Sequence, residues 1–176
     1  MIEGMKACRE AILDAARQMC LAAQTAPKAC GRDSVASAVV EGDDLQRLTA
    51  EMERIQQTPG CRPIFRRDAE LVAQCRAVVL IGVKHQARGL NPCGLCGHGS
   101  CGETARNGGH CSFDDIDLGI AIGSAVSRAA DLRVDNRVLY TAGVAAMNLQ
   151  LLGADVGTIM AIPLTCSARN IFFVRG

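Results

Sequence analysis

Four cysteines, Cys93, Cys96, Cys101 and Cys111, lie within 19 residues of this 176-residue chain. Two, four and nine residues separate them in turn. Four thiolates in so short a segment match the ligand count of a [4Fe–4S] or [2Fe–2S] cluster. The two-residue spacing lets adjacent thiolates reach neighbouring corners of one cluster, and the later pair closes the loop around it. The spacing therefore predicts a metal centre suited to one-electron transfer.

Glycines between these cysteines favour the same interpretation. Six of the chain's 18 glycines lie in this segment. Glycine lets the backbone approach a ligand closely and adopt positive φ, and successive N–H groups in such loops form the anion-binding nests found at iron–sulfur sites. Cys111 also precedes a predicted helix, whose positive dipole end favours an anionic ligand. Asp114, Asp115 and Asp117 in the first turns partly oppose that field.

Structural zinc is the main alternative for this loop, held by four cysteines or with His98 or His110 replacing one of them. A zinc ribbon would have two closely spaced pairs, whereas the second pair here is nine residues apart, so the spacing favours iron–sulfur. A disulfide is disfavoured because cytosolic thiols stay reduced. The G-x-G-x-x-G match at Gly97 starts fourteen residues after the strand that ends at Val83, so we reject it as a dinucleotide loop.

Composition excludes several other classes of function. The chain has 19 Lys and Arg against 18 Asp and Glu, and neither half is basic enough for non-specific nucleic-acid binding. Its longest uncharged stretch, residues 138–154, is shorter than the roughly 20 apolar residues of a membrane span. The first residues lack the apolar region of a secretory signal. We therefore expect a cytoplasmic protein with no nucleic-acid or membrane partner.

The hydrophobic pattern predicts an α/β (α+β) fold in a single domain over residues 1–176, with residues 84–112 as an inserted cluster loop. Helices are expected at 3–24, 43–57, 68–76, 113–130 and 136–152. Ser112 with Asp115 forms the expected capping box of the fourth of these helices, and Asp135 caps the fifth. Strands are expected at 35–40, 77–83, 156–162 and 171–174, the second of them buried on both faces.

Several motifs resemble one family of prokaryotic proteins, over nearly the whole chain. They are the loop 93–101 and the segments 117–126, 134–138 and 162–173. The sequence is similar to uncharacterised proteins that contain a ferredoxin domain, a family of unknown function with a predicted 4Fe-4S domain. The resemblance implies that Cys93, Cys96, Cys101 and Cys111 ligate a [4Fe–4S] cluster. Cys166 and Arg169 stand where the family pattern has serine and lysine.

A second resemblance is to FMN-dependent nitroreductases. Residues 22–30 resemble the A-P-S-x-x-N turn of those enzymes, and residues 143–153 resemble one of their helices. This resemblance implies helices layered around a small mixed sheet, in a homodimer that binds FMN at its interface. The arginine-rich phosphate-binding start and the asparagine of the turn are absent here.

The other cysteines and the remaining polar candidates have separate interpretations. Cys8 shares an apolar helix face with Met5 and Ile12, which predicts core packing, and Cys20 and Cys75 adjoin apolar runs and are interpreted in the same way. The three remaining cysteines, Cys30, Cys61 and Cys166, are candidate redox-active thiols or ligands of a second centre. His85 is a candidate acid–base group, and Arg106 could offset the charge of a cluster.

The sequence thus predicts an iron–sulfur protein with one [4Fe–4S] cluster on the 84–112 loop and an electron-transfer or redox role with a partner protein. It leaves open whether the protein is an enzyme. If it is one, the predicted class is an oxidoreductase. An FMN-dependent, nitroreductase-like oxidoreductase and a structural zinc-binding interaction module are the two alternatives.

Overall fold

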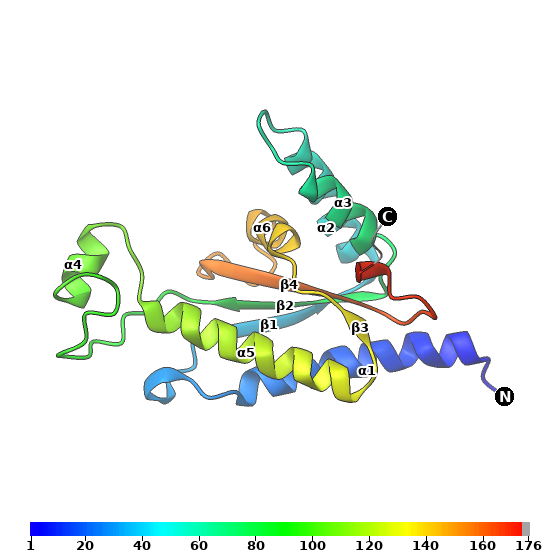
Figure 1. The fold of residues 1–176 in the computed structure, drawn as a ribbon, viewed down its shortest axis with the longest axis horizontal. Helices are drawn as coiled ribbons and strands as arrows, with labels where there is room; N and C mark the ends of the chain where they lie inside the picture. Colours follow the sequence, from blue (N-terminus) through cyan, green and yellow to red (C-terminus); the bar gives the residue numbers. More distant parts are fainter. Residues whose placement is uncertain (174–176) are drawn as a thin grey trace.

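A four-stranded antiparallel sheet lies at the centre of the computed structural model, which describes residues 1–173 (Figure 1). Its strand order is β1 (Val35–Val40), β2 (Ala77–Val83), β4 (Thr158–Thr165) and β3 (Asp135–Asn136). Every described pairing is antiparallel. The layered α/β prediction is confirmed, but the sheet is antiparallel where a mixed sheet was expected. The helical hairpin between β1 and β2 starts and ends at the same end of the sheet, so the chain reverses direction.

Helices cover both faces of the sheet. Helices α1 (Gly4–Thr25) and α5 (Ser112–Asp131) pack on one face, and α6 (Tyr140–Asn148) packs on the other together with the hairpin of α2 (Gly42–Gln56) and α3 (Ile64–Val72) (Figure 1). Alternate residues of β2 enter the two hydrophobic clusters, because successive strand side chains point to opposite faces. All seven β2 residues are buried, as predicted.

Helix α6 approaches the sheet most closely at Gly143. A Cβ atom at this position would overlap the carbonyl oxygen of Ile159 in β4. Only glycine fits at this contact, which allows the buried alanines of α6 to pack directly against the strand.

Replacing Gly143 with alanine is therefore expected to lower the free energy of unfolding by about 1–3 kcal/mol, because the added methyl group overpacks the contact between α6 and β4. Urea denaturation of the two proteins measures the difference. Gly123→Ala is the matched control at an exposed position of helix α5, where a Cβ atom would meet no atom within 4 Å. That variant should be unchanged or more stable, since alanine is the better helix former. Equal stability of Gly143→Ala and wild type would contradict the close approach.

Four predicted elements differ from the structure in their bounds or type, and the first is the strand expected at 156–162, which is β4 (Thr158–Thr165). Helix α3 begins at Ile64 and ends at Val72, and α6 begins only at Tyr140. The latter starts late because Asp135 and Asn136 pair with β4 as strand β3, so Asp135 does not cap it. The predicted terminal strand is instead a short 3-10 helix, η2 (Ile171–Phe173), and Val174 lies outside the described residues. At residues 135–136 the long-range pairing of β3 with β4 overrides the local helical pattern.

The connections carry further short elements. A 3-10 turn, η1 (Ala29–Gly31), follows α1, and α4 (Cys101–Arg106) lies between β2 and α5. Across residues 1–173, every helix is too short or too polar to cross a bilayer.

Candidate metal centre

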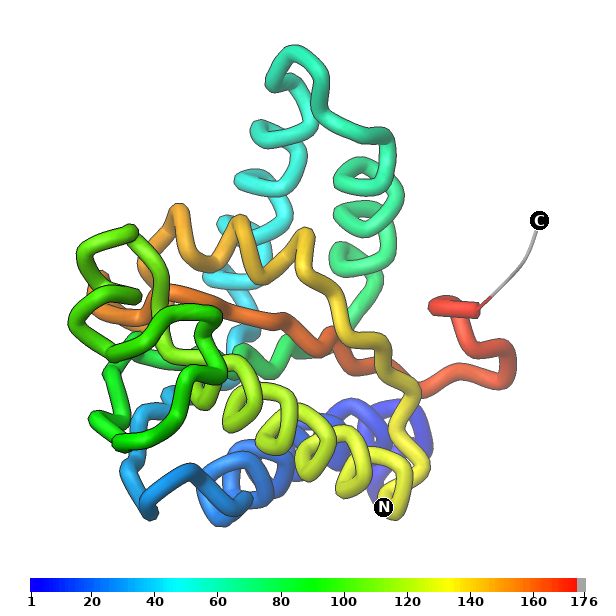
Figure 2. Tube along the Cα trace, turned by 60° about the vertical axis from the view of Figure 1, so that its left-hand side comes forward, coloured from blue at the N-terminus to red at the C-terminus, as the bar shows by residue number. Residues whose placement is uncertain are grey.

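The segment that joins β2 to α5 extends beyond one end of the sheet and carries α4 (Figures 1 and 2). It was expected to be a loop without helices, and α4 corrects that expectation. The Ser100 Oγ atom accepts a hydrogen bond from the Glu103 N–H at 3.2 Å, and the Glu103 carboxylate accepts one from the Gly99 N–H at 3.0 Å. This S-x-x-E capping box explains why the six-residue helix α4 forms among so many glycines, and the motif is readable in the sequence.

The predicted capping box at the start of α5 is wrong. Cys111 occupies the N-cap position, and Ser112 is already the first helical residue. The Ser112 hydroxyl donates instead to the Leu95 carbonyl at 3.1 Å, and the Ser112 N–H donates to the Cys96 Sγ atom at 3.3 Å. The start of α5 therefore holds the cysteine loop in place.

The structure brings the four predicted cysteines around two adjoining cavities. Cys96, Cys101 and Cys111 line both cavities, and Cys93 lines the second. The first cavity has a volume of about 130 Å³. All four thiols are free, with Cys93 exposed, Cys111 buried and the other two half-buried.

Local structure favours the thiolate form of Cys96. The hydrogen bond from the Ser112 backbone N–H lowers the pKa of the Cys96 thiol, against a smaller opposing effect of burial. Cys111 stands before the first turn of the 20-residue helix α5, where the helix dipole also favours negative charge. Thiolates, rather than thiols, are the metal-binding form of cysteine.

The four cysteines do not form a closed single-ion site in the described structure. A tetrahedral zinc site holds its sulfur ligands about 2.3 Å from a single ion, so its ligands crowd around one point. Within residues 1–173, no three His, Cys, Asp or Glu side chains are grouped in that way. Four free thiols border the adjoining cavities, and they are the side chains here that could hold a metal ion or a cluster.

A buried ion network anchors the loop to the rest of the fold. The Arg88 guanidinium lies 3.0 Å from the Asp114 carboxylate and 2.7 Å from the Asp117 carboxylate, and all three side chains are at most 2% exposed. Arg88 also donates to the Gln86 carbonyl and to the Ser34 hydroxyl. The loop, α5 and the segment before β1 are therefore joined through one side chain.

The carboxylates of this network also fix backbone groups. The Gln86 N–H donates to Asp114 at 3.0 Å, and the Ala29 N–H donates to Asp117 at 2.9 Å. Burial alone would lower the pKa of Arg88, but the hydrogen bond to Asp117 and the charges of Asp114, Asp117 and Cys111 raise it above its ordinary value. The Arg88 side chain therefore keeps its positive charge, and it lies close enough to Cys111 to interact with a thiolate there.

Sequence reasoning missed this network. It treated Asp114 and Asp117 only as charges that oppose the helix dipole, and it did not consider Arg88. The only local signal is that Asp114 and Asp117 share one face of a helix at a three-residue spacing. The Arg88 side chain comes from a segment without periodicity, and its partner Ser34 lies 54 residues away.

The histidines are arranged differently from the predictions. His85, expected to be isolated, stacks on His110 with ring centroids 4.0 Å apart, and both line the first cavity. The His110 ring also contacts the Asp115 carboxylate at 2.8 Å. His98 lines the second cavity with the cysteines, and Arg106 is exposed.

The six remaining cysteines lie away from both cavities. Core packing is confirmed for Cys75, which is buried. It is also confirmed for Cys20, which packs against the hydrophobic core between the sheet and helices α1 and α5. The same prediction is wrong for Cys8, which is exposed because the first two turns of α1 extend beyond the core. Cys30 is exposed, and Cys61 and Cys166 are half-buried.

Two comparisons relate this chain to uncharacterized proteins. A family model described as "Uncharacterized protein containing a ferredoxin domain (DUF2148)" matches residues 107–175, a range that includes Cys111 but not the other three cysteines of the loop. An uncharacterized protein of Archaeoglobus fulgidus is 38% identical over 175 residues, which cover 94% of this chain and 92% of the relative.

Several of the similar solved structures are nitroreductases. A nitroreductase with bound FMN from Desulfitobacterium hafniense has a TM-score of 0.63 at 15% identity, covering 89% of this chain and 78% of that chain. A nitroreductase family protein from Clostridium novyi has a TM-score of 0.57 at 14% identity, covering 86% and 71%. At these identities the likeness shows a shared fold.

The turn that resembles the nitroreductase A-P-S-x-x-N motif serves a structural purpose here. The Lys28 ammonium donates to the carbonyl oxygens of Ala23, Gln24 and Ala26 at the end of α1. It thereby satisfies carbonyl groups that the helix leaves unpaired. The lysine in this turn is therefore committed to helix termination.

Proposed function

We propose that this chain, which belongs to the family of uncharacterized proteins containing a ferredoxin domain, binds one [4Fe–4S] cluster and transfers electrons. The ligands are Cys93, Cys96, Cys101 and Cys111. The observation that carries the proposal is that three of these thiols line both adjoining cavities and the fourth lines one of them. When bound, the cluster supplies one-electron oxidation and reduction.

Two features near the cysteines would influence the reduction potential of such a cluster. The Ser112 N–H donates to the Cys96 sulfur, and hydrogen bonds of this kind help to set cluster potentials. The buried Arg88 guanidinium places positive charge near Cys111. Both features favour the anionic ligands of the cluster.

The exposed side of the loop suits contact with a redox partner protein. Cys93 is exposed, and Leu90 and Leu95 beside it are 41% and 58% exposed. A rim of apolar side chains next to a metal centre offers a small contact surface, as transient electron-transfer encounters use. The proposed role is therefore one-electron exchange with a second protein at this rim.

Electron paramagnetic resonance of anaerobically purified protein tests the proposal. We expect a coloured protein that is silent as isolated and gives the signal of a reduced [4Fe–4S] cluster after addition of dithionite. A sample that stays silent after reduction, or that gives a [2Fe–2S] signal, would contradict it. Heating the same sample tests the FMN alternative, because a bound flavin would be released as a yellow fluorophore.

A further inference from the structure

Two buried side-chain atoms of the ion network lack a hydrogen-bond partner among residues 1–173. They are the Nε atom of Arg88 and the Oδ1 atom of Asp114. The Asp114 atom still has an opposite charge beside it, because the Nη1 atom of Arg88 lies 3.0 Å away. The Arg88 Nε–H has no such compensation, and a buried donor of a charged group is costly to leave unpaired. We therefore asked which acceptor could reach it.

The other two guanidinium nitrogens of Arg88 are engaged within the fold. Nη1 donates to the Gln86 carbonyl oxygen at 2.8 Å. Nη2 donates to the Ser34 hydroxyl at 2.9 Å and to the Asp117 carboxylate at 2.7 Å. A planar guanidinium holds its five N–H donors in fixed directions, and this side chain is only 1% exposed. These contacts therefore hold the Nε–H in one orientation, away from solvent.

Arg88 belongs to the wall of the second cavity of the cysteine loop. All four predicted ligands line the same cavity: Cys93, Cys96, Cys101 and Cys111. Apart from the cysteines, Thr104 is the other buried polar side chain of this wall, and its hydroxyl donates to the Ser100 carbonyl at 3.2 Å. Arg88 is therefore the buried cation of the cavity wall, and its Nε–H is a buried donor without a partner.

The missing acceptor is expected to come with the group that the cavity holds. None of the four cysteine sulfurs accepts a hydrogen bond from the Arg88 Nε–H. An iron–sulfur cluster brings inorganic sulfides of its own, and these carry negative charge and accept hydrogen bonds. A cationic N–H donor pairs best with an anionic acceptor. The sulfides of the proposed cluster therefore have the chemistry that this donor lacks.

We propose that the Nε–H of Arg88 donates a hydrogen bond to an inorganic sulfide of the [4Fe–4S] cluster and thereby raises the reduction potential of the cluster. This inference rests on the proposed function, because the acceptor belongs to the cluster. Reduction adds one electron to the cluster, and a hydrogen bond from a cation stabilises the more negative state more strongly. Arg88 keeps its proton throughout. The network orients the donor in advance, so it does not have to turn when the charge of the cluster changes.

The hydrogen bond can be observed in the wild-type protein, without a substitution. Protein labelled with ¹⁵N at the arginine Nε atoms is purified anaerobically, reduced with dithionite and examined by pulsed electron paramagnetic resonance. We expect an isotropic ¹⁵N coupling to the reduced cluster, because such coupling passes through a hydrogen bond to its sulfur. A reduced [4Fe–4S] signal without that coupling would overturn this inference and leave the proposed function intact. The absence of any cluster signal would overturn both.

Arg88→Lys assigns the coupling and measures its effect on the potential. Lysine keeps the positive charge but has no Nε–H at this position of the side chain. The variant should lose the ¹⁵N coupling, and its ratio of reduced to oxidised cluster at a fixed potential should fall roughly tenfold. For a one-electron couple this fall is a shift of about 59 mV to lower potential. An unchanged potential with the coupling retained would overturn the assignment to Arg88.

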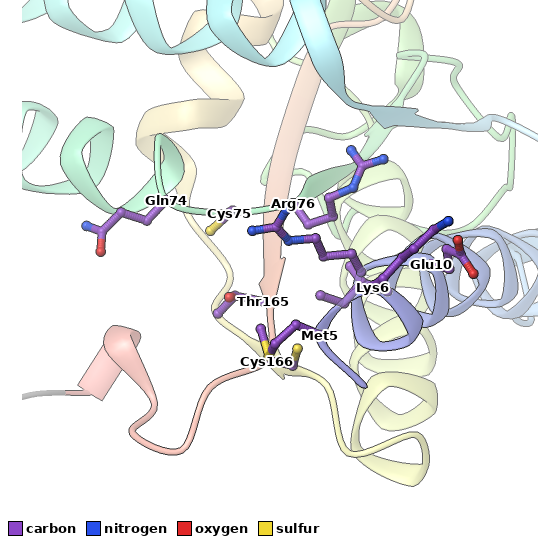
Figure 3. A pocket seen from close by; sticks show the side chains of 10 residues that line it. Met5, Lys6, Glu10, Gln74, Cys75, Arg76, Thr165 and Cys166 are labelled. Carbon is purple, nitrogen blue, oxygen red and sulfur yellow. The ribbon is translucent and has the colours of Figure 1, made fainter. Parts of the chain in front are cut away.

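Two other arginines provide matched controls. Arg106→Lys alters an exposed side chain of the same loop. Arg76→Lys alters a side chain that pairs with Glu41 at 2.9 Å and lines a separate cavity beside the start of β2 (Figure 3). Both variants should keep the ¹⁵N coupling and the potential of wild type. Loss of the coupling in either control would overturn the assignment, and the wild-type spectrum decides the question if Arg88→Lys does not fold.

Discussion

Replacing Cys96 with alanine is expected to remove the iron from anaerobically purified protein, from about four atoms per chain to fewer than about one. Cys96 lines both cavities, and its sulfur accepts a hydrogen bond from the N–H of the first residue of α5. Replacing Cys96 removes one proposed bond to the cluster and also the hydrogen bond between the Cys96 sulfur and the Ser112 N–H. Iron analysis of the two proteins, purified side by side, measures the effect.

Cys61→Ala is the matched control for this experiment. Cys61 is half-buried, as Cys96 is, but it lies in the turn before α3 and away from both cavities. We expect the iron content of this variant to equal that of wild type. Full iron content in Cys96→Ala, or equal losses in the two variants, would show that Cys96 is not a ligand.

The second large effect is expected from Arg88→Leu, which should lower the free energy of unfolding by about 3–5 kcal/mol. The change leaves the carboxylates of Asp114 and Asp117 buried without their cation, although each is at most 2% exposed. Uncompensated buried charge is among the costliest defects in a fold. Urea denaturation of the metal-free proteins under anaerobic conditions gives the difference without a contribution from bound metal.

Two further variants make this measurement specific. Arg106→Leu removes a similar side chain from an exposed position of the same loop and should change stability by no more than about 0.5 kcal/mol. Adding Asp114→Asn and Asp117→Asn to Arg88→Leu should restore part of the lost stability, because it removes the two unpaired charges. A stability loss in Arg88→Leu no larger than in Arg106→Leu would exclude the network as an anchor.

The sequence was most informative where one local rule decides the structure. The fully apolar run 77–83 could only be a buried strand, and the three- and four-residue spacing along 3–24 places Ile12, Ala16 and Met19 on the core side of α1. The same rule failed for Cys8 on that face, because periodicity gives the side of a helix but not how far the core extends along it. The start of α6 was misplaced because β3 forms through a long-range pairing.

Some residues of the candidate site could be predicted from the sequence, and others could not. The cysteine spacing singled out the residues that meet at the two cavities, since ligands close in sequence leave a recognisable pattern. Arg88 left no such pattern, because its partners Ser34 and Asp117 lie 54 and 29 residues away.

Iron, acid-labile sulfide and zinc analysis of the anaerobically purified wild-type protein tests the central proposal most directly. The proposed [4Fe–4S] centre predicts about four iron and four sulfide per chain, with no stoichiometric zinc. A colourless protein that contains one zinc per chain, without iron or sulfide, would contradict the proposal and identify the cysteine loop as a structural zinc site.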